Sequence, residues 1–173
     1  MTTRQGAATI SLIGMPGAGK STVGVVLAKL AGLRFIDTDI DLQVRAGASL
    51  QQILERDGYQ QLRALEQDVL LDLDLQGAVV ATGGSAVYSA AAMHRLRQAG
   101  PVVYLDVDLA TLQRRVAAAP PRGIACDVGL EFADIHAERC PLYQRYADLT
   151  VDAGSAGADT VAAKILRELG LPH

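Results

Sequence analysis

Short apolar runs that alternate with helical patterns constrain the fold of this chain more than any other feature of its sequence. The runs have the length of buried strands and cover residues 8–13, 34–36, 78–81, 102–107 and 149–151. Strands that are separated by helices form parallel sheets with helices on both faces. We therefore predict an α/β fold in three layers, with a five-stranded parallel sheet covered by helices on both faces.

The helical patterns place apolar residues three or four positions apart, as in a helix that packs one face on a sheet. They cover residues 23–30, 40–56, 62–75, 90–98, 109–118, 131–146 and 161–169. Gly47 and Gly58 punctuate the polar-rich part that holds the second and third of these helices. Ligands of such folds bind beyond the carboxyl ends of the strands, and the chemistry is expected there.

Composition narrows the class of protein. The chain has 173 residues, of which 50% are hydrophobic, and this fits one compact domain over residues 1–173. A net charge of −3 gives no general field for nucleic acid, and no apolar run reaches the length of a membrane span. Cys126 and Cys140 have no disulfide or zinc spacing, which fits a reducing cytoplasm. We predict a cytoplasmic protein that acts on a small molecule and contacts neither nucleic acid nor membrane.

The segment GMPGAGKST matches the phosphate-loop pattern G-x-x-x-x-G-K-S/T and stands between a predicted strand and a predicted helix. Glycines let successive backbone N–H groups and the helix N-terminus point at the phosphates of a nucleotide. The lysine adds a mobile charge, and the serine hydroxyl can ligate Mg²⁺. The predicted nucleotide-binding residues of this loop are Gly14, Pro16, Gly17, Ala18, Gly19, Lys20, Ser21 and Thr22.

A phosphate loop alone fits GTPases, motor ATPases and small-molecule kinases, so the rest of the chain must decide between them. Asp37 and Asp39 alternate at the end of a predicted strand, so both carboxylates can face one cleft. Arg63 lies three residues before Glu66 on a predicted helix, which gives the cation a partner that orients it. The two glycines of residues 82–85 let backbone N–H groups approach a ligand closely.

Each of these residues also fits a plain structural role. Asp is a common helix N-cap, an i, i+3 Arg–Glu pair is common on surfaces, and two glycines can form a simple turn. Four arginines flank a Pro-, Ala- and Gly-rich stretch, residues 117–129, that has the composition of a mobile loop; they are Arg114, Arg115, Arg122 and Arg139. The phosphate loop upstream favours the functional interpretation.

Together these motifs resemble the shikimate kinase family of the nucleoside monophosphate kinase-like P-loop superfamily. The resemblance covers nearly the whole chain, in the family's order and spacing. It implies a P-loop kinase fold with a substrate-binding helical region at about residues 38–75 and a mobile lid at about residues 117–130. The segments that carry it are GMPGAGKST, FIDTDIDLQVRAGASLQQILERDGYQQLRALE, VVATGGSAV, VVYLDV and ERCPLYQRYADLTVD.

The resemblance implies roles for residues on the acceptor side of the site. Asp37 would help to hold Mg²⁺ with Ser21, and Asp39 would bind the acceptor hydroxyl and could act as a base. Two arginines would grip a substrate carboxylate above the glycine-rich turn. The implied substrate-binding residues are Asp39, Arg63, Gly83, Gly84 and Arg139.

On the nucleotide side, the resemblance implies ATP as the phosphoryl donor and Mg²⁺ as the cofactor. Arg115 would stack near the adenine, and Arg122 would be the lid arginine that closes over the phosphates. The implied catalytic residues are Lys20, Asp39 and Arg122.

Departures from the family pattern gather on the substrate side. Leu54 and Leu62 stand where the family usually has Phe, and Ser85 stands where it has a third Gly. The lid pattern Arg-Pro-Leu-Leu is replaced by RGIA at residues 122–125. These changes leave the phosphate chemistry intact and could reshape the cleft for another acceptor.

The sequence therefore predicts a monomeric or weakly associating kinase that phosphorylates a hydroxyl of a small carboxylated metabolite. The favoured reaction is ATP-dependent conversion of shikimate to shikimate 3-phosphate, in aromatic amino acid biosynthesis. A kinase of a different hydroxy acid or polyol is one alternative. A non-catalytic relative that only binds nucleotide is the other.

Overall fold

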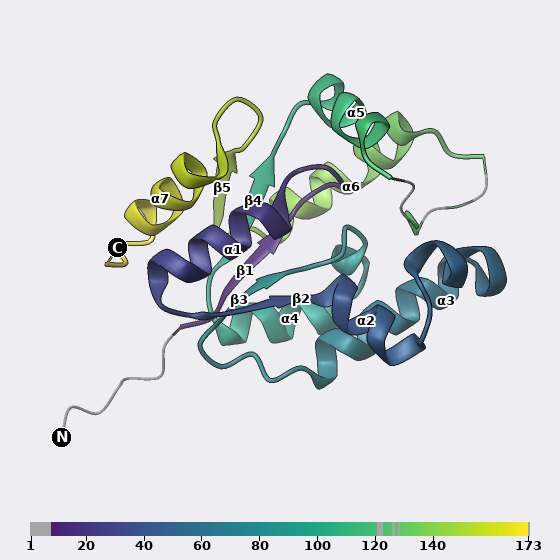
Figure 1. Ribbon diagram of the computed structural model, residues 1–173, viewed down its shortest axis with the longest axis horizontal. Coiled ribbons are helices and arrows are strands. Elements are labelled where there is room, and N and C mark those ends of the chain that lie inside the picture. The colour runs from purple at the N-terminus through teal and green to yellow at the C-terminus, as the bar shows by residue number, and fades with distance from the viewer. Residues whose placement is uncertain (1–7, 121–122, 126, 128, 173) are drawn as a thin grey trace.

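The structure is a computed structural model that describes residues 8–120, 123–125, 127 and 129–172. Its centre is a five-stranded parallel sheet with the strand order β2-β3-β1-β4-β5 (Figure 1). The strands are β1 (Ile10–Ile13), β2 (Arg34–Asp37), β3 (Ala78–Ala81), β4 (Val102–Asp106) and β5 (Leu149–Asp152). The predicted five-stranded parallel α/β sheet is confirmed.

Helices cover both faces of this sheet. They are α1 (Lys20–Ala31), α2 (Thr38–Ala46), α3 (Leu50–Asp72), α4 (Ala90–Ala99), α5 (Leu109–Ala118), α6 (Phe132–Tyr146) and α7 (Ala158–Glu168), with a 3₁₀ turn, η1 (Ala86–Tyr88). Helices α1 and α7 pack together over one face, and α4 and α6 lie against the other (Figure 1). In the part of the chain that the structure describes, no helix is long and apolar enough to cross a bilayer.

Burial follows the position of each strand in the sheet. Every residue of β1 and β3 is buried, because each of these strands has neighbours on both sides and helices above and below. The edge strands β2 and β5 are partly exposed. The central strands therefore make a rigid base for the loops at their carboxyl ends.

Between β2 and β3, the bounds of the helices differ from those that the sequence predicts. The helical segment expected over residues 40–56 divides at Gly47, which takes a left-handed conformation (φ 61°) and ends α2. Ser49 then starts α3 with a capping box, in which its side chain accepts from the backbone of Gln52. Helix α3 runs on to Asp72 with one non-helical residue, Gly58 (φ 82°), so the predicted break there is a kink.

A second, smaller apolar cluster supports this region. Its buried members come from α2, α3 and one residue of the predicted lid, and they are Leu42, Ile53, Leu62, Val69 and Ala125. Gly123 lies directly against the backbone of Leu50, since a Cβ at Gly123 would stand 2.6 Å from the Leu50 carbonyl. Gly123 and Ala125 of the predicted lid are thus packed against this region, Gly123 at the start of α3.

Candidate active site

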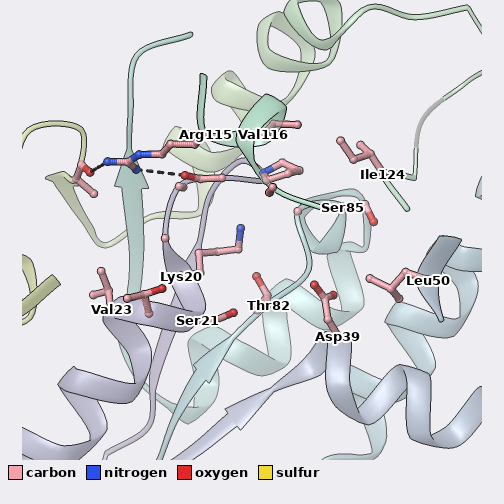
Figure 2. Close-up of a pocket in the computed structure, with 18 of the residues that line it drawn as sticks. Lys20, Ser21, Val23, Asp39, Leu50, Thr82, Ser85, Arg115, Val116 and Ile124 are labelled. Atoms are coloured by element: carbon pink, nitrogen blue, oxygen red, sulfur yellow. Dashed lines mark hydrogen bonds between the residues drawn. The ribbon is translucent and has the colours of Figure 1, made fainter. Parts of the chain in front are cut away.

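A cavity of about 600 Å³ opens at the carboxyl ends of the strands, a volume typical of sites for small molecules. The phosphate loop, Asp39 and Thr82 line it and follow β1, β2 and β3, respectively. Figure 2 shows Lys20, Asp39 and Ser85 around this space, with Leu50 and Ile124 at its far side. The phosphate loop therefore shares one cavity with Asp39, Gly84 and Arg139 of the predicted acceptor residues, whereas Arg63 and Gly83 do not line it.

The phosphate loop is held in a conformation that requires glycine. Gly14, Gly17 and Gly19 have φ values of 150°, 85° and 93°. A Cβ at Gly14 would stand 2.9 Å from the carbonyl oxygen of Leu105, so the loop also passes close to β4. Gly19 caps α1 without a side-chain hydrogen bond, which leaves the first N–H groups of the helix for an anion. The other predicted loop residues, Pro16, Ala18 and Thr22, line the same cavity.

Lys20 folds over this loop. Its Nζ donates hydrogen bonds to the carbonyl oxygens of Gly14 at 2.7 Å and Met15 at 3.0 Å. The loss of hydration on burial lowers the pKa of Lys20 to about 8, and the nearby Asp39 carboxylate opposes that shift. At neutral pH the ammonium is still mostly protonated, so it can bind a phosphate.

The two predicted metal ligands lie side by side. Ser21, in the first turn of α1, donates from its hydroxyl to Asp37 Oδ2 at 2.5 Å. Asp37 ends β2 and caps α2 by accepting from the Asp39 backbone N–H at 3.1 Å. Asp37 thus has the N-cap role considered above as well as a position beside Ser21. Among the described residues there is no cluster of three or more His, Cys, Asp or Glu that could hold a metal.

Asp39 and Glu66 meet at the glycine turn after β3. A Cβ at Gly83 would stand 1.7 Å from Glu66 Oε1 and 3.1 Å from Asp39 Oδ1, so only glycine fits there. Burial, followed by repulsion from the Asp39 carboxylate, raises the pKa of Glu66 to about 8. Glu66 therefore holds its proton at neutral pH. The turn is fixed by Thr38, whose Oγ1 accepts from the Gly83 backbone N–H at 3.0 Å.

Arg63 and Arg139 converge on one oxygen atom. The backbone carbonyl of Ala125 accepts from Arg139 Nη2 at 2.6 Å and from Arg63 Nη2 at 3.2 Å. Arg139 is only 1% exposed and lies close to Gly84, where a Cβ would stand 2.9 Å from Arg139 Nη1. The Nε atoms of both arginines are buried without a hydrogen-bond partner in the described structure. The two guanidinium groups are thus directed at a single oxygen acceptor, which belongs to the main chain.

The predicted pairing of Arg63 with Glu66 is wrong. The described structure has no ion pair or hydrogen bond between them, because Glu66 turns into the buried corner beside Gly83. Arg63 lies instead over the ring of Tyr88, with its Cζ 3.8 Å from the ring centroid. Their spacing on the helix puts both residues on one face but does not set the direction of either side chain.

Arg115 ties two loops together at the opposite end of the cavity. Its guanidinium donates to the carbonyl oxygens of Gly17 at 3.2 Å and Ala153 at 3.1 Å (Figure 2), and also to that of Gly154 at 3.1 Å. These bonds hold the guanidinium of Arg115 between the phosphate loop and the loop after β5. Arg114, by contrast, is exposed. The predicted lid arginine, Arg122, lies outside the described residues, as does Cys126.

Sequence reasoning missed three tyrosines at the acceptor side. Tyr143 in α6 donates to the carbonyl oxygen of Gly84 at 2.6 Å, and Tyr59 and Tyr88 lie against Arg63. Tyrosines are scattered along the sequence and match no motif. The only available signal was the position of Tyr88 four residues after the glycine turn.

Comparisons with known proteins agree with this geometry. The family model for shikimate kinase matches residues 16–170. A shikimate kinase of Synechococcus sp. (strain RCC307) is 43% identical over 162 residues, which cover 91% of this chain and 82% of that protein.

Solved structures show the same likeness. Shikimate kinase from Acinetobacter baumannii, in complex with shikimate, superposes with a TM-score of 0.84 at 32% identity and covers 94% of this chain and 93% of its own. Shikimate kinase from Aquifex aeolicus gives a TM-score of 0.79 at 31% identity, with coverage of 93% and 95%. The predicted P-loop kinase fold and small-molecule kinase class are confirmed, and ATP is the co-substrate of such kinases. This chain belongs to the shikimate kinase family.

Proposed function

We propose that this chain transfers the γ-phosphoryl group of ATP to a hydroxyl of shikimate and forms shikimate 3-phosphate, a step of aromatic amino acid biosynthesis. Membership of the family supports the reaction. The observation that carries the acceptor assignment is the convergence of Arg63 and Arg139 on a single oxygen inside the cavity of the phosphate loop. Two guanidinium groups in such an arrangement favour a carboxylate.

The phosphate loop would bind the nucleotide. The positive φ values of Gly14, Gly17 and Gly19 and the start of α1 directly after this loop support this, because such a loop and helix start can present N–H groups to an anion. Lys20 would leave the loop carbonyls and bind the β- and γ-phosphates, and Arg122 would join it from the lid. Arg115 would stack near the adenine ring, since its hydrogen bonds hold it at the end of the cavity beside Gly17.

Ser21 and Asp37 fit a magnesium ion. Both offer hard oxygen donors, they already approach each other to 2.5 Å, and they lie beside the phosphate loop. Magnesium in phosphoryl-transfer sites is usually held by one or two protein groups, by water and by phosphate oxygens, so a larger acidic cluster is not required. When bound, Mg²⁺ neutralises charge on the β- and γ-phosphates.

Asp39 would orient the acceptor hydroxyl and take its proton. The neighbouring Glu66 holds its own proton at neutral pH, so it does not compete with Asp39 for the proton of the hydroxyl. As the proton moves to Asp39, the hydroxyl oxygen bonds to the γ-phosphorus and the bond to the bridging oxygen of ATP breaks. Lys20 and Arg122 would stabilise the charge that spreads over the transferring group. Closure of the lid would exclude water as a competing acceptor.

A second candidate is a kinase of another hydroxy acid. Ser85 favours it, since this buried residue lines the cavity and its Oγ has no hydrogen-bond partner in the described structure. A buried hydroxyl without a partner favours a ligand that supplies one. Such a ligand would still carry a carboxylate, because the arginine pair is unchanged.

The test is ADP release by the purified protein with Mg-ATP at several shikimate concentrations, followed by mass spectrometry of the product. We expect a saturable, shikimate-dependent rate of at least about 1 s⁻¹, the lower end for kinases. A rate that shikimate does not change, combined with turnover of another hydroxy acid, would support the second candidate. Nucleotide binding with no turnover on any acceptor would contradict both.

We further propose that the enzyme works in the cytoplasm as a monomer or weak oligomer. The phosphate loop, Asp39 and Arg139 line one cavity of this chain, which favours catalysis by a single copy. The two cysteines have no spacing for a structural disulfide or a zinc site, which suits a reducing compartment. Light scattering across the concentration range of the assay tests whether the enzyme is a monomer or a weak oligomer.

A further inference from the structure

Two tyrosine rings hold the guanidinium group of Arg63. Its Cζ lies 3.8 Å from the centroid of the Tyr88 ring and 5.0 Å from that of Tyr59. A cation within about 6 Å of an aromatic face is attracted by the ring, and more strongly where water is excluded. Arg63 is half-buried and has no carboxylate partner within ion-pair distance in the described structure. The two rings therefore fix the direction of Arg63 together with the Ala125 carbonyl oxygen, which accepts from its Nη2 at 3.2 Å.

Tyr88 is held in place and contacts both arginines. It ends η1, the turn that follows Gly83 and Gly84, and its hydroxyl donates to Glu138 of α6. The same ring lies 5.4 Å from the Cζ of Arg139. One rigid side chain thus links the glycine turn, the exposed side of α6 and the two guanidinium groups that converge on a single oxygen.

A long arginine side chain must adopt one of many rotamers before it can form a directed bond to a ligand. The loss of that freedom weakens binding unless the side chain is already fixed in the free protein. An aromatic face fixes the plane of the guanidinium and leaves its edge N–H groups for a carboxylate. For Arg63, one of those edge groups is the Nη2 that points at the Ala125 oxygen.

We propose that Tyr88, assisted by Tyr59, is a positioning residue that sets the affinity for the acceptor carboxylate by holding Arg63 in its binding orientation. This inference rests on the proposed function, because it takes the arginine pair as the carboxylate site. It adds residues that determine the affinity for the acceptor and that belong neither to the phosphate loop nor to the aspartates and arginines of the site.

The first test compares wild type, Tyr88→Leu and Tyr88→Phe by kcat, by KM for shikimate and by KM for ATP. Tyr88→Leu should lower kcat/KM for shikimate by about two- to thirty-fold, mainly through KM, with the KM for ATP unchanged. Tyr88→Phe keeps the ring and loses only the hydrogen bond to Glu138, so it should stay within about twofold of wild type. Melting temperatures of the three proteins show whether they fold equally well.

The second test separates positioning from a general structural role. Tyr88→Leu is made again in an Arg63→Ala background, with kcat/KM taken from initial rates at shikimate concentrations below KM. If Tyr88 acts through Arg63, the substitution should change kcat/KM much less in this background. An equal loss of kcat/KM in both backgrounds would overturn the proposal.

A third measurement needs no substrate. In ¹⁵N-labelled protein the Nε–Hε signal of Arg63, identified by its loss in Arg63→Ala, should lie upfield and move downfield in Tyr88→Leu as the ring is removed. An unmoved signal would contradict the proposal even if the kinase is active. Conversely, a wild type without shikimate-dependent turnover contradicts the proposed function, while this spectrum still reports whether Tyr88 holds Arg63. If Tyr88→Leu does not fold, Tyr59→Leu takes its place, with a smaller effect of the same sign.

Discussion

The hydroxyl of Ser21 donates a hydrogen bond of 2.5 Å to the carboxylate of Asp37. This bond joins the first turn of α1 to the end of β2, which are adjacent only because both face the carboxyl edge of the sheet. Two oxygen donors held this close beside a phosphate loop suit a small, hard cation such as Mg²⁺.

Loss of the Ser21 hydroxyl or of the Asp37 negative charge should therefore raise the Mg²⁺ concentration that the enzyme needs. We expect Ser21→Ala and Asp37→Asn to raise the Mg²⁺ concentration that gives half-maximal activity by about tenfold or more, in line with the value of one charge-assisted contact. Activity is measured against Mg²⁺ at fixed ATP. Thr160→Ala is the control, since Thr160 is an exposed hydroxyl residue of α7 that does not line the cavity. Magnesium curves that coincide with wild type would remove both residues from the metal site.

Lys20→Met should abolish most turnover without unfolding the protein. Methionine has nearly the length of lysine, so it keeps the packing beside the loop but loses the charge and the two bonds to Gly14 and Met15. Removal of one group that stabilises transition-state charge costs about 100- to 1000-fold in kcat. Lys29→Met is the matched control, because Lys29 is exposed in the same helix. A Lys20→Met protein with near-normal kcat shows that the lysine is misassigned.

The two arginines should respond differently to truncation. Arg63→Ala is expected to raise the KM for shikimate by about 10- to 150-fold and to leave ATP binding intact, since a hydrogen bond to a charged group is worth about 1.5–3 kcal/mol. Arg139→Ala should also lower the melting temperature, because Arg139 is fully buried and leaves a cavity. Arg45→Ala, which removes an exposed pair with Asp72, is the control. An unchanged KM in Arg63→Ala would reject its role.

Gly83→Ala tests the close approach at the glycine turn. The new Cβ would stand 1.7 Å from Glu66 Oε1, so the Glu66 and Asp39 side chains must move. A displacement of about 1 Å can cost about 100-fold in rate, and we expect a loss of this order in kcat/KM for shikimate with the KM for ATP little changed. Gly157→Ala is the control, since a Cβ there meets no atom within 4 Å. Equal kinetics for the two variants would mean that the turn does not position the acceptor.

The features that the sequence predicts well are those set by local pattern. The phosphate loop, for example, is one short motif between a buried strand and a helix, and its glycines determine its conformation. Likewise Ser21 lies just after the phosphate loop and Asp37 lies at the end of a strand, and the parallel topology brings the two residues together. Sequence order and strand spacing were sufficient for both.

Features that depend on tertiary direction were not predictable. The spacing of Arg63 and Glu66 indicates a pair, but burial turns Glu66 toward Gly83 and Tyr88 takes its place beside the arginine. The acceptor between the two arginines is the main-chain oxygen of Ala125, and a main-chain group leaves no trace in a pattern of side chains. The sequence shows a glycine at both position 47 and position 58. Whether the helix ends there, as at Gly47, or only kinks, as at Gly58, depends on packing.

The protonated Glu66 predicts how stability depends on pH. The pKa of Glu66 rises from about 4.5 in the unfolded chain to about 8 in the folded one, so between these values only the folded state binds the proton. Stability from this group is present in full below pH 4.5 and is lost as the pH rises through 8, by at most about 1.4 kcal/mol per pH unit. Glu66→Gln keeps the shape without the titration. In urea unfolding at pH 5, 6, 7 and 8, the free energy of unfolding of Glu66→Gln should therefore rise relative to that of wild type by a few kcal/mol over this range, on the order expected from that slope. Groups other than Glu66 are the same in both proteins, so their effects cancel in the comparison. Parallel curves of the free energy of unfolding against pH would mean that Glu66 is already ionised in the free enzyme.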